Sequence, residues 1–95
     1  MKNITAENQN LFYWWVDTDF CFEDFSVPKF ALYCMEKNEN NHKDRDTEEL
    51  VFWAAYADVP GYDEAAENDD IQRQWDTIDA YIASKIGFLP EYDIN

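Results

Sequence analysis

Carboxylates outnumber basic side chains three to one in this chain, which is nevertheless rich in aromatic residues. Its 95 residues include 21 Asp and Glu against seven Lys and Arg, a formal net charge of −14, and 18% are Phe, Trp or Tyr. Acidic segments that stay disordered lack the apolar surface that offsets chain entropy, and this chain has that surface. We therefore expect a folded body whose surface charges repel one another, a cost which suggests that the charge is used.

The length is that of a single domain, residues 1–95, with one core and little room for an elaborate enzyme cleft. Cys21 and Cys34 are too few for a disulfide framework, so we expect both to be reduced, small core residues. The longest early apolar run covers residues 11–16, too short for a signal peptide or a membrane span. These features favour a cytoplasmic protein.

The clearest predicted element is a helix near the C-terminus. Apolar residues recur there at spacings of four, three, four and four, which places them on one helical stripe: Ile71, Trp75, Ile78, Ile82 and Ile86. Asp69 or Asp70 can cap the start, Gly87 can supply a left-handed residue past the end, and Pro90 prevents continuation. On its exposed flank, Arg73 is expected to pair with Asp69 or Asp76.

Two further helices are predicted from weaker patterns. Residues 47–58 follow Asp46, a possible cap, and their interior is apolar on every side, which fits a buried helix or a buried strand; two alanine pairs favour the helix. Residues 26–37 place apolar side chains on one helical face, with Pro28 in the first turn. The polar stretch 36–46 is predicted to be an exposed loop.

The N-terminal part leaves two interpretations open. Residues 11–16 have strong strand propensity and could pair with residues 20–22 as a hairpin, whereas a helix beginning at Thr5 competes with that arrangement. The sequence thus predicts a mainly α fold, a bundle of about three helices, with α+β as the alternative if the aromatic N-terminal segment is a hairpin.

Little in the sequence points to an enzyme. His42 is the single histidine and lies in a polar stretch, and the two cysteines lack the spacing of a zinc site. With two glycines there is no phosphate-binding loop, and neither residues 17–19 nor residues 69–70 fit the calcium-loop pattern. We therefore expect no catalytic residues, no metal and no cofactor.

The seven basic residues are scattered and form no stripe. Proteins that bind nucleic acid or anionic membranes directly present such a basic surface. We therefore expect neither as a direct partner.

The acidic residues supply the positive argument. Residues 58–70 hold six acids and no base and lead directly into the predicted C-terminal helix. Such a run is usually a solvated face, but solubility is served by a net charge of about 2–8 in a small domain, and this chain exceeds that. The predicted partner-binding residues are Asp63, Glu64, Glu67, Asp69, Asp70, Asp76 and Asp79. The secondary candidates are Phe12, Trp14, Trp15, Asp17 and Asp19.

In size, charge and aromatic content the chain resembles the acidic DNA-mimic inhibitors of phages and mobile elements, of the anti-restriction or anti-CRISPR type. That resemblance implies a non-enzymatic inhibitor whose partner is a positively charged nucleic-acid-binding protein. The alternative is an immunity protein or antitoxin that neutralises a cationic nuclease or toxin, because acidic complementarity would serve both roles. The aromatic excess also predicts an apolar interface, either with the partner or in a homodimer.

Overall fold

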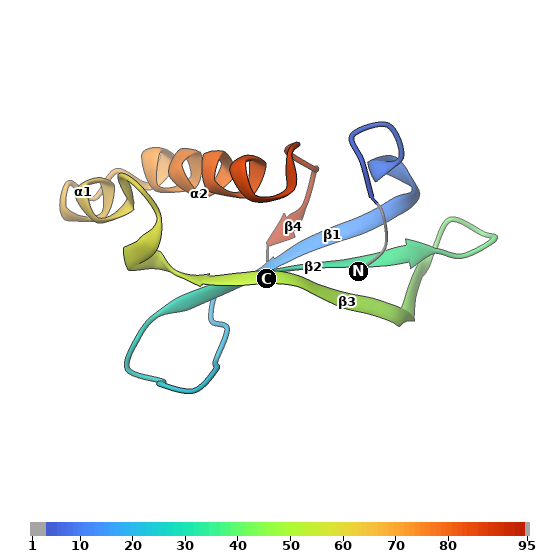
Figure 1. The fold of residues 1–95 in the computed structure, drawn as a ribbon, viewed down its shortest axis with the longest axis horizontal. Coiled ribbons are helices and arrows are strands. Elements are labelled where there is room, and N and C mark those ends of the chain that lie inside the picture. Colours follow the sequence, from blue (N-terminus) through green and yellow to red (C-terminus); the bar gives the residue numbers. More distant parts are fainter. Residues whose placement is uncertain (1–3, 95) are drawn as a thin grey trace.

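The computed structural model describes residues 4–94, which form a four-stranded sheet with two helices on one face (Figure 1). The elements in chain order are the short 3-10 helix Gln9–Leu11, β1 Phe12–Asp17, β2 Lys29–Lys37, β3 Lys43–Ala55, the 3-10 helix Tyr56–Asp58, α1 Tyr62–Glu67, α2 Ile71–Ile86 and β4 Asp93–Ile94. The fold is therefore α+β. Within these described residues no helix has the length and apolar character needed to cross a membrane.

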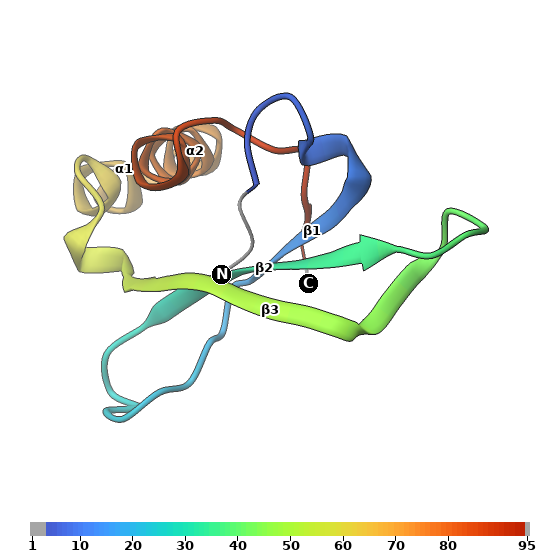
Figure 2. The ribbon, with the colours of Figure 1, turned by 45° about the vertical axis from the view of Figure 1, so that its right-hand side comes forward.

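The strand order is β3-β2-β1-β4. β1 and β3 both pair antiparallel with β2, while the short β4 runs parallel to β1. Both helices follow β3 and return over the same face of the sheet, so the molecule has two layers and the opposite face has no helix on it (Figure 2).

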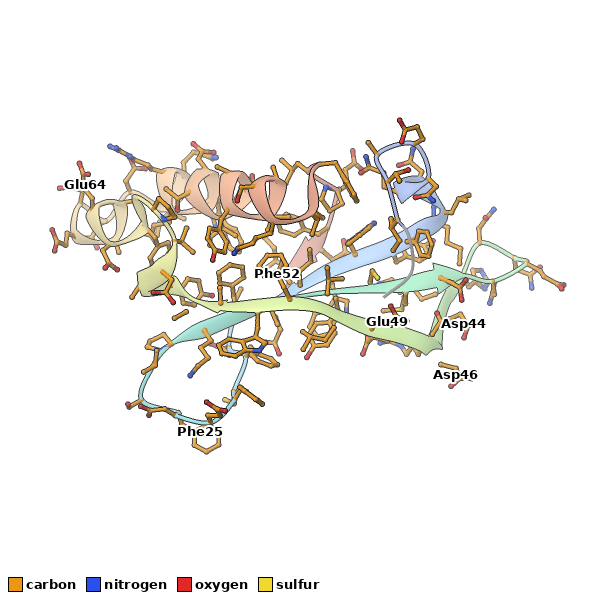
Figure 3. The ribbon with its side chains drawn as sticks, viewed as in Figure 1. Phe25, Asp44, Asp46, Glu49, Phe52 and Glu64 are labelled. Atoms are coloured by element: carbon orange, nitrogen blue, oxygen red, sulfur yellow. The ribbon has the colours of Figure 1, made fainter. Side chains whose placement is uncertain are left out.

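The core lies between the sheet and α2. Alternation along β2 directs Phe30 and Leu32 toward the helices, and both are fully buried with Val16 of β1 and Ile82 of α2. Phe52 of β3 packs edge-on against Phe30 and points toward the helical layer (Figure 3). The sheet and the amphipathic helix thus bury each other's apolar sides.

The predicted three-helix bundle is wrong, because two of its three helices are strands. Residues 29–37 form β2, the central strand, in which Phe30 and Leu32 lie under the helices while Ala31 and Met35 are buried on the other face. A strand that is buried on both faces lacks the polar alternation that would reveal it in a sequence.

Residues 47–55 belong to β3 rather than to a helix, and residues 56–58 form a 3-10 turn. The pairing of β3 with β2 shifts between Phe52 and Leu50, which lie opposite Leu32 and Tyr33. Such a bulge adds a residue to the strand and breaks its period of two. The apolar run of residues 50–57 also lacks alternation because apolar side chains occupy both faces of β3, with Phe52 and Ala54 on the helical side and Leu50 and Trp53 on the other.

The N-terminal aromatic segment is a strand, as one interpretation predicted, but its partner is β2 and not residues 20–22. Residues 18–28 instead form a long loop on the helix-free side (Figure 1). In place of a helix beginning at Thr5 there is the 3-10 turn Gln9–Leu11. The predicted loop 36–46 shrinks to residues 38–42, since its ends belong to β2 and β3.

The C-terminal helix is confirmed with its ends. The Asp70 carboxylate accepts a hydrogen bond from the Arg73 backbone N–H at 3.1 Å, and Gly87 ends α2 with φ 90°. Ile78 and Ile82 of the apolar stripe are buried, whereas Ile71 is 63% exposed. Neither of the two cysteines forms a disulfide; Cys34 is buried as predicted, but Cys21 is exposed in the 18–28 loop.

Candidate functional site

The seven predicted partner-binding carboxylates all lie on the helical layer. α1 carries three of them, the turn between the helices two, and α2 the remaining two. Six are exposed, and we call this set the acidic layer: Asp63, Glu64, Glu67, Asp69, Asp70 and Asp76. The seventh, Asp79, is partly buried, and its carboxylate accepts a hydrogen bond from the Tyr92 hydroxyl. Asp79 therefore helps to hold the C-terminal segment against α2 in addition to contributing negative charge.

Local sequence explains how the acidic layer is held. Gly61, with φ 83°, precedes α1, whose first turn contains Asp63 and Glu64. Carboxylates are favourable there because the N-terminal end of a helix carries partial positive charge. Asp69 has φ 52°, a left-handed conformation that Asp tolerates better than most residues, and it turns the chain into α2. The turn geometry therefore fixes the start of α2 relative to α1.

Arg73 is the one basic residue among these carboxylates. Its guanidinium lies 3.9 Å from the Glu64 carboxylate, so it pairs across from α2 to α1 rather than with Asp69 or Asp76 as the helical spacing predicted. Asp76 instead accepts a hydrogen bond from the Gln72 side chain at 3.0 Å. Both partners of the Arg73 pair are more than half exposed, so the contact neutralises little of the surrounding field.

Charge is distributed unevenly along the molecule. Residues 58–79 carry eight carboxylates and one arginine, a net charge of −7, whereas residues 37–46 carry three bases and three acids and are neutral. These segments lie toward opposite ends of the 45 Å long axis: Glu64 marks the helical end, and Asp44 and Asp46 mark the end at the β2–β3 hairpin (Figure 3). The negative field is therefore concentrated at the helical end.

The secondary candidates do not form one site. Phe12 and Trp14 point to the helical side, where Trp14 is only 5% exposed, packs edge-on against Phe88 and donates its indole N–H to the Gln9 carbonyl oxygen. Phe12 is partly buried against the same core. Trp14 therefore stabilises the fold and offers little surface to a partner, whereas the partly buried Phe12 also lines a groove beside α2.

Trp15, Asp17 and Asp19 belong to the other side of the sheet. The Trp15 ring stacks on Tyr33 with centroids 4.5 Å apart, and its N–H donates to Glu48 at 2.9 Å. Asp17 ends β1, and its carboxylate accepts the Asp19 backbone N–H at 3.0 Å in the exposed 18–28 loop. The structure thus separates these three residues from Phe12 and Trp14 by the thickness of the sheet.

We call the side of the sheet without helices the open face. Alternation along the paired strands places on it Tyr13, Trp15, Asp17, Ala31, Tyr33, Met35, Lys37, Leu50 and Trp53. The 18–28 loop covers part of it, because the rings of Phe20 and Phe22 pack on Trp53 at 6.2 and 5.1 Å between centroids. Tyr33, Trp53 and these two Phe were not predicted as site residues, since only the strand pairing brings them together.

Three tyrosines have raised pKa values because their phenols are removed from water. Burial is the main cause at each: it raises the pKa of Tyr56 to about 12, and it raises those of Tyr33 and Tyr92. Neighbouring carboxylates add to the effect, Asp17 and Glu48 at Tyr33 and Asp79 at Tyr92. Each shift keeps the phenol neutral, which suits a hydrogen-bond donor.

A groove of about 730 Å³ opens beside the acidic layer, between the start of β1, α2 and the C-terminal segment. Its walls combine the rings of Trp75 and Tyr92 with the carboxylates of Asp79 and Glu91. Aromatic faces and carboxylates both attract cationic side chains. Across residues 4–94, no group of three or more His, Cys, Asp or Glu side chains is arranged to hold a metal ion.

Comparisons with models of protein families, with curated proteins and with solved structures found no match to this chain.

Proposed function

We propose that the chain is a non-enzymatic acidic inhibitor of a positively charged nucleic-acid-binding protein. In this proposal the acidic layer occupies the surface where phosphates would lie, as in the phage and mobile-element inhibitors that block restriction or CRISPR machinery. The observation that carries it is the display of six exposed carboxylates on two helices and their connecting turn, with Arg73 as the one base among them.

The charge density of the helical layer supports this role. The 16 residues of α2 extend over about 24 Å, since a helix rises about 1.5 Å per residue. One strand of duplex DNA carries about seven phosphates over the same length. The helices and their turn carry seven carboxylates and two basic residues, Arg73 and Lys85, which gives a net charge of −5. Five of the seven carboxylates lie on α1 and the turn, so the layer as a whole, rather than α2 alone, carries a negative charge of the same order as those phosphates.

Several basic side chains are engaged within the molecule, which leaves the acids dominant. The ammonium groups of Lys37 and Lys43 lie 5.0 and 5.6 Å from the centroid of the Tyr13 ring, and that of Lys85 lies 5.2 Å from the Tyr81 ring. The buried Lys29 donates to the carbonyl oxygens of residues 24 and 27 at 2.7 and 3.0 Å. These contacts oppose direct binding of nucleic acid.

Affinity capture followed by competition tests the proposal. The immobilised chain should retain a basic nucleic-acid-binding protein from a host lysate at low salt and release it at high salt, because screening weakens the many exposed charges. The captured protein should then lose its bound nucleic acid when the free chain is added. A gel shift that shows tight, direct binding of this chain to DNA or RNA at physiological salt would refute the proposal.

The identity of the captured protein separates the two roles that acidic complementarity allows. A restriction enzyme, a CRISPR effector or other nucleic-acid machinery of the host would support counter-defence. A nuclease or toxin encoded beside this chain would support the immunity or antitoxin alternative.

A further inference from the structure

The open face concentrates the exposed apolar surface of the molecule. Among the described residues nine large hydrophobic side chains are exposed, and five belong to the open face or its loop: Phe22, Phe25, Val27, Leu50 and Trp53. Phe25 is 79% exposed at the tip of the 18–28 loop, on the helix-free side (Figure 3). Exposed apolar patches of this kind mark interaction surfaces.

The strands of the open face are electrically balanced, although the chain carries a net charge of −14 and the 18–28 loop adds three exposed acids at one end. Three bases lie at the end of the open face next to the β2–β3 hairpin. Strand alternation places Lys37 on this face, and Lys43 and Arg45 line a depression together with Trp15 and Met35. They are offset by Asp17, Glu48 and Asp93, of which Asp93 lies 3.5 Å from the Lys43 ammonium. A highly basic partner would therefore be attracted to the acidic layer and not to this face.

The two ends of the open face have opposite character. The 18–28 loop rises at one end and carries the exposed acids Asp19, Glu23 and Asp24, while the three bases lie at the other end, next to the β2–β3 hairpin (Figure 1). A two-fold axis that lies in the plane between two facing copies, perpendicular to the line from the loop to the hairpin end, would set the acidic loop of each copy against the basic end of the other. The same contact would form twice, as symmetric dimers require.

We propose that the open face is the interface of a homodimer in which two copies pack sheet against sheet, with the 18–28 loop of each at the hairpin end of the other. The helices then lie on the outside, so the two acidic layers are separated by more than the sheet spacing of about 10 Å, which exceeds the Debye length of about 8 Å at physiological salt. The inference does not depend on the proposed inhibitory function.

Sedimentation equilibrium over a range of protein and salt concentrations tests the dimer. Dimerisation should strengthen as NaCl rises from about 0.05 to about 0.5 M, because salt screens the repulsion between two chains of charge −14 more than it weakens pairs closed inside the interface. This salt dependence is opposite in sign to that of target binding, so the two proposals can fail separately. A chain that stays monomeric at every salt and protein concentration would overturn the dimer.

A substitution in the middle of the face locates the interface. Leu50→Glu introduces like charges near the two-fold axis and should raise the dimer dissociation constant about tenfold or more, whereas Ile71→Glu, on the exposed start of α2, should leave it unchanged. If Leu50→Glu does not fold, as judged by circular dichroism, Phe25→Lys at the loop tip gives a second test, because it places a base against the basic end of the other copy. A folded variant of either position that dimerises like the native chain would overturn the proposal, because the interface would then lie elsewhere.

Charge reversal tests the two-fold arrangement. Glu23→Lys alone and Arg45→Glu alone should each weaken the dimer, since each places like charges at the contact between loop and hairpin end. The double variant should recover most of the lost affinity. A double variant that is weaker than both single variants would overturn the arrangement.

Discussion

The two sides of the sheet differ in what they bury and in what they present. On one side α2 covers Phe30 and Leu32 completely, and its outer surface, with α1, displays the acidic layer. The other side has no helix, strands of balanced charge next to an acidic loop, and stacked rings such as Trp15 on Tyr33. The acidic layer thus lies on the helical side, whereas the most exposed aromatic side chains, Phe22, Phe25 and Trp53, lie on the other side.

This separation explains how a small domain tolerates so much charge. The acids that repel one another are mounted on surface helices whose inner sides are fixed by an apolar core. The aromatic excess that the core does not need gathers on the face where the charge is balanced. Stability should therefore depend mainly on the helix-covered side, and association through rings on the open side.

The largest expected difference between the two sides is in the stability lost when an aromatic side chain is replaced by alanine. Phe30→Ala removes a fully buried ring between the sheet and the helices and should lower the free energy of unfolding by about 3–5 kcal/mol. Trp53→Ala, on the open face where the ring is 38% exposed, should cost about 1 kcal/mol. Urea denaturation at a concentration where the chain is monomeric measures both. Equal losses would mean that the open face is part of the core.

The next largest expected effect is the pH dependence of the free energy of unfolding that comes from Tyr56, the residue that connects the two sides. Tyr56 contacts Phe30 in the core and donates its hydroxyl to the Thr18 carbonyl oxygen at 2.7 Å, where the 18–28 loop begins. Burial raises its pKa to about 12 from an ordinary value of 10.0, so between these values the unfolded chain ionises first and stability falls as pH rises. Below pH 10 this contribution to stability is fully present.

Urea denaturation at about pH 9 and about pH 11 measures that fall. Tyr56→Phe should make it smaller, although Tyr33 and Tyr92, whose pKa values are also raised, keep part of it. A variant that loses as much stability as the native chain over this range would show that the Tyr56 phenol is as accessible as in the unfolded state.

The smallest expected effects on stability distinguish carboxylates of the acidic layer that support the fold from those that are only exposed on its surface. Asp70→Ala removes the cap of α2 and should cost about 1 kcal/mol, whereas Asp70→Asn keeps an acceptor and should cost much less. Glu64→Gln should change the free energy of unfolding by less than about 0.5 kcal/mol, because its contact with Arg73 is long and exposed. Thermal unfolding of the three variants tests this order, and a loss at Glu64 as large as that of Asp70→Ala would contradict it.

The parts of the fold that the sequence revealed are the local ones. The stripe through Ile78 and Ile82, the Asp70 cap and the Gly87 end all lie within α2, so its own residues determine them. β2 could not be recognised in the same way, because it is buried on both faces: Phe30 lies under the helices and Ala31 is buried on the opposite face of the sheet. That double burial depends on pairing with residues far away in the chain.

The same distinction applies to the candidate site. The carboxylates from Asp63 to Asp76 are close in sequence, so their gathering on one helical layer could be anticipated. The bond from Tyr92 to Asp79, which removes that carboxylate from the fully exposed set, spans the loop after α2 and has no local signal. The stacking of Trp15 on Tyr33 likewise exists only through the register of β1 and β2.

The most direct test of the central claim compares two variants of equal charge. One neutralises acids of the helical layer with Asn or Gln: Asp63, Glu64, Glu67, Asp69 and Asp76. The control neutralises the same number of exposed acids elsewhere: Glu7, Glu23, Asp24, Glu39 and Asp46. Both change the net charge equally, so a difference between them reports position and not total charge.

The measurement is the concentration of each folded variant needed to displace nucleic acid from the captured basic partner at physiological salt. The account predicts that the control displaces nearly as well as the native chain and that the helical-layer variant does not displace. A helical-layer variant that displaces as well as the control would contradict the claim that these carboxylates occupy the place of phosphates.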